Sequence, residues 1–275
     1  MQGPGTDFLG RDPEESVNFP KSSAAPQPSK RPLATSGRLD QIVFLLCFRN
    51  HRDRKLPDKS VYDAILNSEG GHPDYAPGGS ALDYVREVSY DRISIYTTIV
   101  DWIDLPETEK YYAAGVEGLE NSRLHEALQY AIEHAEQEGL IDYSKFDSNS
   151  DGHVDLLGFI HSGYGAEANR LAADGSRPAD RIWSHRYAIP EWTSPATGKR
   201  ISDYAIASGL FGISGSAPCR LGLLVHESAH QVGFLDLYDT RLGPRSQKGS
   251  GIGIWGLMAA HYGFEKSGHY PPHLS

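Results

Sequence analysis

The stretch HESAHQVGFLDLYD, residues 226–239, determines how the rest of this sequence is interpreted. It opens with two histidines and a glutamate in the spacing H-E-x-x-H. Residues four apart lie on one face of an α-helix, so His226 and His230 can direct two imidazoles at one metal ion. Zinc accepts such nitrogens in tetrahedral geometry and keeps a position open for water in catalytic sites. Glu227 lies beside the first of these histidines, where it can take a proton from that water as a general base.

The second half of the stretch predicts how a third ligand reaches the ion. Gly233 can adopt a backbone conformation forbidden to other residues, so it can end the helix and turn the chain. We expect Asp236 to return beneath the metal as the third protein ligand, with Asp239 as the alternative. The competing interpretation is an ordinary helix that carries two of the 12 histidines in the chain. The apolar residues 221–225 before the motif, and its extension to Gly233 and Asp236, favour the zinc site.

Several residues near the motif have expected roles around it. Met258 can pack beneath the two histidines as a soft, shape-adapting floor, although most methionines are plain core residues. His261 follows this methionine, and one interpretation places it at the lining of a cleft. For Tyr238 and Tyr262 we expect packing rather than contact with the reacting groups. His185 is expected to be a hydrogen-bonded structural histidine.

Composition excludes some classes of protein. The chain has 275 residues, a formal net charge of −10 and a pI near 5.6, which argues against a nucleic-acid-binding surface. The longest apolar run, Ile42–Phe48, is far too short to span a membrane, so no transmembrane segment is predicted. No apolar segment follows Met1, so no signal peptide is visible; the expectation is a cytosolic protein or an incomplete gene model.

The two cysteines are expected to be buried free thiols rather than a disulfide framework. Cys47 lies in an apolar run, and Cys219 lies just before the H-E-x-x-H motif. The alternative, a regulatory Cys219 thiolate on the zinc, has no support from its flanking residues.

The alternation of elements predicts an α/β (mixed) fold. Residues 1–37 are rich in Pro, Ser, Gly and Lys and are expected to be disordered or linker-like, which leaves 38–275 as one catalytic domain. The predicted strands are Ile42–Phe48, Ile93–Val100, Val154–His161 and Ile201–Ala207. The predicted helices outside the motif are Ser60–Ser68 and Ser80–Val88, each opened by a serine cap, and Ser122–Glu138 with its apolar stripe. The basic residues 49–55 are expected to form a solvated loop. We therefore expect a twisted mixed sheet with the motif helix packed on it.

A second metal site is predicted in the loop DSNSDGHVD, residues 147–155. Oxygen side chains at positions 1, 3, 5 and 9 and a glycine at position 6 form the pattern that wraps calcium. The side chains are those of Asp147, Asn149, Asp151 and Asp155, and position 7 would contribute the backbone carbonyl of His153. The loop departs from an EF-hand because Gly158 replaces the glutamate at position 12 and a flanking helix pair is missing. The alternative is an Asp/Asn-rich turn that binds nothing.

On these residues the chain resembles the immune inhibitor A family of secreted zinc metallopeptidases. The segments that carry the resemblance are 226–239, 79–90, 147–154 running into 161–165, and 182–186, while Trp255–Met258 is similar to the methionine turn of metzincin-like enzymes. The resemblance implies a metzincin-like endopeptidase that acts on proteins or peptides, with zinc on His226, His230 and an acidic third ligand, and with structural calcium. It also implies export to the extracellular space. Similar proteins usually carry a signal peptide and a propeptide and continue past the methionine turn, whereas this sequence stops at Ser275.

Three functions remain open from the sequence. The first is a zinc endopeptidase, and the second is a zinc hydrolase of small amides, which needs the same chemistry in a differently shaped cleft. A long cleft that aligns an extended peptide with a sheet edge would favour the first. The third is a catalytically inactive, calcium-stabilised binding module, against which Glu227 argues because such a module needs no base beside the zinc. Subsite preference and oligomeric state are not predicted.

Overall fold

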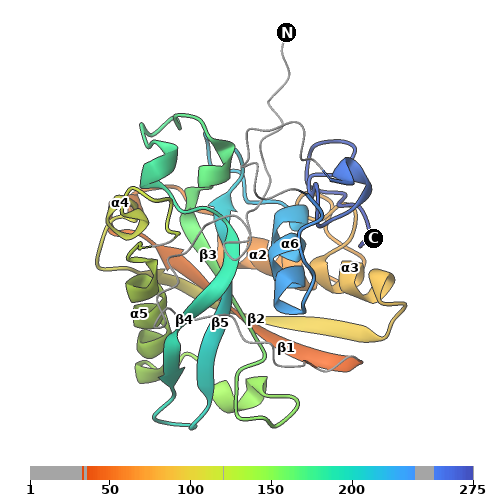
Figure 1. The fold of residues 1–275 in the computed structure, drawn as a ribbon, viewed down its shortest axis with the longest axis horizontal. Helices are drawn as coiled ribbons and strands as arrows, with labels where there is room; N and C mark the ends of the chain where they lie inside the picture. Colours follow the sequence, from red (N-terminus) through yellow and green to blue (C-terminus); the bar gives the residue numbers. More distant parts are fainter. Residues whose placement is uncertain (1–32, 34–35, 120, 239–250, 275) are drawn as a thin grey trace.

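The fold is that of a computed structural model which describes residues 33, 36–119, 121–238 and 251–274 (Figure 1). The predicted linker-like segment 1–37 lies almost entirely outside the described residues, as does Asp239. Within the described part, no helix has both the length and the apolar content needed to cross a bilayer.

A five-stranded sheet forms the centre of the molecule, with the strand order β2-β1-β3-β5-β4. Neighbouring strands run parallel except at one edge, where β4 is antiparallel to β5. The strands are β1 (Gly37–Cys47), β2 (Ile93–Asp104), β3 (Leu156–Tyr164), β4 (His185–Thr193) and β5 (Arg200–Leu210). The predicted mixed α/β fold is therefore confirmed.

The burial of the strands follows from their places in the sheet. Every residue of β3 is buried, and so are the last seven residues of β1, because helices cover both faces of a parallel sheet. The apolar side chains of β1 and β3 allow this burial. The outer strand β2 instead mixes buried and exposed positions along its length.

The helices divide into two layers, one on each face of the sheet (Figure 1). On one face, α4 (Glu109–Ala113) and α5 (Leu124–Gln137) pack on apolar side chains of the sheet, among them Phe44 and Phe159. On the other face, α2 (Lys59–Asn67), α3 (Ala81–Val88) and α6 (Leu221–Gln231) enclose a second cluster with Val43 and Ile160. The H-E-x-x-H motif lies on α6, so the second layer carries the candidate site.

The predicted serine caps are correct at one helix and wrong at another. Ser80 caps α3 in a capping box: its hydroxyl accepts from the Asp83 amide, while the Asp83 carboxylate accepts from the Ser80 amide. At α2, however, Asp58 is the N-cap residue and Ser60 lies inside the first turn. Helix α5 begins at Leu124, two residues after its predicted start at Ser122.

Other boundaries also differ from the prediction. The edge strand β4 and the short helix α4 were not predicted. The basic segment 49–55 is not simply a solvated loop, because it contains a 3-10 turn at Arg49–His51 with the His51 ring buried. The strand predicted from Ile93 runs on to Asp104, and the one predicted from Val154 begins at Leu156.

Both cysteines are buried free thiols, as predicted. Burial raises the pKa of the Cys47 thiol to about 11 and that of Cys219 to about 12. Because only a thiolate binds zinc well, these raised pKa values disfavour Cys219 as a metal ligand.

Candidate metal centre

The motif lies on helix α6, which belongs to the second layer of helices. Its first residues, 221–225, are buried against the sheet, and the three residues His226, Glu227 and His230 follow on the same buried helix. Gly222 lets the helix approach the segment that follows Met258, since a Cβ on it would lie 1.9 Å from the His261 carbonyl oxygen. Gly233 ends the turn after α6 with a φ of +99°, as its place in the motif predicts.

The structure brings the predicted zinc ligands together. The Asp236 Oδ1 atom lies 3.4 Å from His226 Nε2 and 3.6 Å from His230 Nε2. The two imidazole rings stand nearly perpendicular, with centroids 4.8 Å apart. Glu227 completes the group, because one potential ligand atom from each of His226, Glu227 and His230 lies within 4.8 Å of the others. All four side chains are buried. The alternative ligand Asp239 lies outside the described residues.

The backbone fixes which nitrogen of each imidazole faces the centre. His226 Nδ1 lies 3.0 Å from the Leu257 carbonyl oxygen, and His230 Nδ1 lies 2.8 Å from the Phe234 carbonyl oxygen. A carbonyl oxygen only accepts hydrogen bonds, so each Nδ1 carries a proton and each neutral ring directs its Nε2 lone pair inward. Two imidazole nitrogens and one carboxylate oxygen form a donor set that suits zinc. The residues present therefore fit a zinc ion.

Burial and the neighbouring carboxylates act in opposite directions on the pKa values of the two histidines. Burial lowers the pKa of the His226 ring, but the Asp236 and Glu227 carboxylates outweigh it and raise this pKa to about 9. Burial, together with the neighbouring His226, lowers the pKa of His230 to about 4.

The residues downstream of the motif pack against α6 and bond to the segment that carries Asp236. Met258 is buried in one cluster with Leu224, Val225 and Ala229 of α6. Its carbonyl oxygen accepts a hydrogen bond from the Leu237 amide, so the segment that orients His226 also holds the chain just after Asp236.

The neighbouring histidines have structural surroundings. The ring of His261 is buried, with its centroid 5.4 Å from that of His226. His261 also lines a pocket together with Cys219 and Arg220, which agrees with the interpretation that places it at a cleft. His185 is the hydrogen-bonded structural histidine that we expected: its ring nitrogens lie 2.7 Å from the Trp183 carbonyl oxygen and 2.8 Å from the Tyr204 hydroxyl.

Two glutamines that attach α6 to the sheet were missed by the sequence analysis. Gln41 of β1 donates to the Ser228 hydroxyl at 3.4 Å and accepts from the Thr97 hydroxyl at 3.0 Å. At the end of α6, Gln231 donates to the Leu157 carbonyl oxygen at 2.7 Å. The available signal was the presence of Gln41 directly before an apolar buried strand, where a polar side chain requires a partner.

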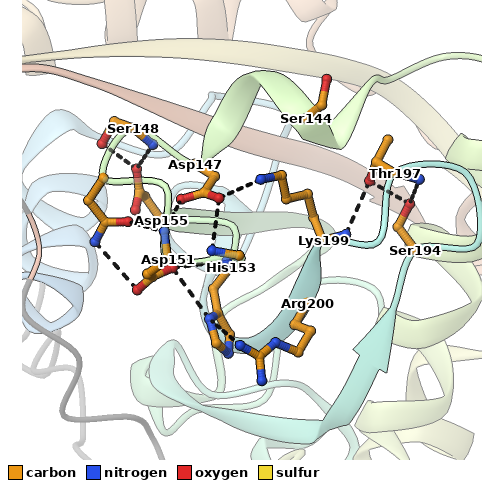
Figure 2. Close-up of polar contacts among 12 residues, drawn as sticks. Ser144, Asp147, Ser148, Asp151, His153, Asp155, Ser194, Thr197, Lys199 and Arg200 are labelled. Carbon is orange, nitrogen blue, oxygen red and sulfur yellow. Dashed lines mark hydrogen bonds and ion pairs between the residues drawn. The ribbon is translucent and has the colours of Figure 1, made fainter.

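The acidic loop is a compact turn whose side chains accept hydrogen bonds from its own amides (Figure 2). Asp147 accepts from the Asp151 and Gly152 amides, Asn149 from the Asp151 amide, and Asp151 from the His153 amide. Asp155 Oδ2 accepts from both the amide and the hydroxyl of Ser148, while Asp155 Oδ1 is buried without a hydrogen-bond partner. The ring of His153 lies near Asp151, Glu191 and Arg200. The calcium loop and the Asp/Asn-rich turn, the two predicted interpretations, share this turn geometry. Asp155 Oδ1 is the buried oxygen that remains for a cation.

Comparison with known proteins identifies related sequences. The family described as "Immune inhibitor A peptidase M6, catalytic domain" matches residues 58–269. Immune inhibitor A of Bacillus thuringiensis subsp. alesti is 26% identical over 267 residues, which covers 81% of this chain and 36% of that protein. The pre-pro-metalloprotease PrtV of Vibrio cholerae serotype O1 (strain M66-2) is 26% identical over 232 residues, covering 74% of this chain and 23% of that protein. The chain therefore spans about a third or less of the length of these curated relatives.

Proposed function

The chain belongs to the immune inhibitor A peptidase family M6, and from this premise we propose that it is a zinc-dependent endopeptidase. The observation that carries the proposal is the convergence of His226 Nε2 and His230 Nε2 on one oxygen of Asp236, beside Glu227. We propose that these three ligands hold the zinc and that residues 38–275 form the catalytic domain. The metzincin-like interpretation, with Met258 in a methionine turn beneath the site, is part of the same proposal and is supported by its burial against α6.

The mechanism follows from the position of each side chain. Zinc bound at this centre would lower the pKa of a water molecule towards about 7 and polarise the peptide carbonyl. Glu227 is buried next to the ligand nitrogens, where its carboxylate can accept the proton of the attacking water and pass it to the leaving amine. Asp236 brings a negative charge among the ligands, so we expect a weaker Lewis acid than three neutral histidines would give.

The sheet edge favours proteins or peptides over small amides as substrates. The edge strand β4 pairs with β5 on one side, and α6 packs against both strands. The outer side of an edge strand offers backbone donors and acceptors to which an extended peptide can add as a further strand. The hydrolase of small amides remains the alternative, and Glu227 argues against an inactive binding module.

We also propose that the acidic loop binds calcium through Asp147, Asn149, Asp151 and Asp155 and the carbonyl oxygen of His153. The observation that favours a cation is the buried Asp155 Oδ1 without a partner, since an unpaired buried oxygen is costly. Export to the extracellular space is a further part of the proposal, and it rests on the family alone.

The test is zinc content by elemental analysis, together with casein cleavage in the presence and absence of 1,10-phenanthroline. We expect one zinc per chain and cleavage that the chelator abolishes. Zinc without casein cleavage would favour the small-amide hydrolase. A well-folded protein without zinc would contradict the proposal and favour the binding module.

A further inference from the structure

The acidic loop already has a cation beside it, supplied by the turn between β4 and β5 (Figure 2). Lys199 Nζ lies 2.5 Å from Asp147 Oδ2. The Asp147 side chain is fully buried, whereas 24% of the Lys199 side chain is exposed. The first acidic residue of the predicted calcium loop is therefore paired with a lysine that retains access to solvent.

The turn that carries Lys199 is held in one conformation. The Ser194 hydroxyl accepts from the amide and the hydroxyl of Thr197, and the Ser194 amide donates to the Lys199 carbonyl oxygen at 2.8 Å. The Lys199 amide in turn donates to the Thr197 hydroxyl at 3.3 Å. Because its backbone is fixed, Lys199 is placed beside the loop by the fold itself.

The turn and the loop are also joined through their backbones. The Arg200 amide donates to the Gly152 carbonyl oxygen at 2.9 Å, and the Val154 amide donates to the Arg200 carbonyl oxygen at 3.0 Å. The guanidinium of Arg200 lies 3.4 Å from His153 Nδ1. Two positive side chains, Lys199 and Arg200, thus approach a loop with three aspartates.

Lys199 pairs with a buried carboxylate that also accepts hydrogen bonds from the amides of Asp151 and Gly152. An ammonium group satisfies one carboxylate, whereas calcium takes six to eight oxygen ligands. Lys199 therefore neutralises Asp147 but leaves Asp155 Oδ1, which is also buried, without a partner.

We propose that Lys199 is a tethered cation that competes with calcium for Asp147. This inference rests on the calcium site proposed above. Calcium occupies the loop only when the ammonium of Lys199 moves away to solvent, and the loop stays folded without calcium because the ammonium then returns. The affinity for calcium is set by ligand charge, so this competition makes calcium binding weak and adjustable.

The test compares calcium binding by the wild-type chain and Lys199→Met, measured by calorimetry with CaCl2. The methionine keeps the length of the side chain and removes its charge. We expect the variant to bind calcium at least about tenfold more tightly than the wild type. The matched control is Lys145→Met, which removes the same charge from an exposed lysine 3.9 Å from Asp142, just before the loop. This control should change the affinity less than about twofold.

Thermal unfolding gives a second readout that does not depend on calorimetric signal. In calcium-free buffer we expect a lower Tm for Lys199→Met than for the wild type, because Asp147 is then a buried charge without a cation. Calcium should restore this Tm. The double variant Asp147→Asn/Lys199→Met should fold without calcium and show no calcium-dependent shift, which keeps the test valid if Lys199→Met alone folds poorly.

An equal calcium affinity of Lys199→Met and wild type would overturn the competition. Absence of calcium binding in both would overturn it together with the calcium site. Neither result bears on the peptidase proposal, because zinc content and casein cleavage are measured separately on the same preparations.

Discussion

The orientation of the two ligand imidazoles depends on backbone atoms that no residue pattern specifies. His226 and His230 each donate Nδ1–H to a carbonyl oxygen, of Leu257 and of Phe234. The sequence analysis could predict the spacing of the ligands, because they lie on one helix. It could not predict these acceptors, since any residue type provides a carbonyl oxygen.

At the same scale, Glu227→Gln should abolish casein cleavage while zinc remains bound. The substitution removes the base and leaves the three proposed ligands, so we expect a loss in kcat on the order of a hundredfold to ten-thousandfold. Glu138→Gln, at the exposed end of α5, is the matched control and should keep wild-type activity. Cleavage by Glu227→Gln at a near wild-type rate would refute the assignment of the base.

A buried carboxyl on the other face of the sheet should make stability depend on pH. Burial raises the pKa of Glu109 to about 8, although Arg54 and Arg181 act in the opposite direction. The rings of His51 and His161 lie 3.6 and 3.7 Å from its carboxylate, and burial lowers the pKa of each to about 3. Between pH 4.5 and about 8, we therefore expect the folded state to hold a proton on Glu109 that the unfolded state releases.

Because the folded pKa of Glu109 is raised, its contribution to stability is present below about pH 4.5 and is lost as the pH rises to about 8. Glutamine resembles the protonated carboxyl and does not titrate. We expect the Tm of the wild type to fall relative to that of Glu109→Gln between these pH values, in a series of thermal melts. Glu107→Gln, which removes an exposed carboxylate paired with Arg49, serves as the control and should run parallel to the wild type. Parallel curves for Glu109→Gln and the wild type would show that Glu109 is ionised in the folded protein.

At the scale of elements, local signals predicted α3 and α6 well and β4 poorly. The capping box at Ser80 and the glycine after α6 act within a few residues, so the sequence displays them. The strand β4 contains Pro190 and several polar residues, and it exists through its pairing with β5 at the sheet edge. Such pairing depends on residues distant in the chain and leaves a weak local pattern.

The two serines predicted as caps provide a matched pair of variants. Ser80→Ala removes the hydroxyl that accepts from the Asp83 amide, so we expect a loss of about 1 kcal/mol in the free energy of unfolding. Ser60→Ala, inside the first turn of α2, should leave this free energy nearly unchanged. Urea denaturation of both variants measures the difference. Equal effects of the two substitutions would contradict the cap assignment.

At the scale of the whole molecule, the sheet separates two sets of buried polar groups. The candidate zinc centre lies on the face covered by α6, and Glu109 with its histidines lies at α4 on the opposite face. The alternation of elements predicted the fold class, and the spacing of the motif predicted the proposed zinc ligands, because both patterns are visible in short stretches of sequence. Links between distant segments, such as Gln41 with Ser228 or Lys199 with Asp147, arise only when the sheet assembles. They explain why α6 and the acidic loop are held where they are.

The central claim is that His226, His230 and Asp236 hold a catalytic zinc ion, and anomalous X-ray diffraction at the zinc edge tests it most directly. We predict one anomalous peak about 2.0–2.2 Å from His226 Nε2, His230 Nε2 and one oxygen of Asp236, with Glu227 near but not bound to the ion. A peak bound by Asp239 in place of Asp236 would correct the third ligand. Crystals of zinc-supplemented protein with no peak between the two histidines would contradict the account.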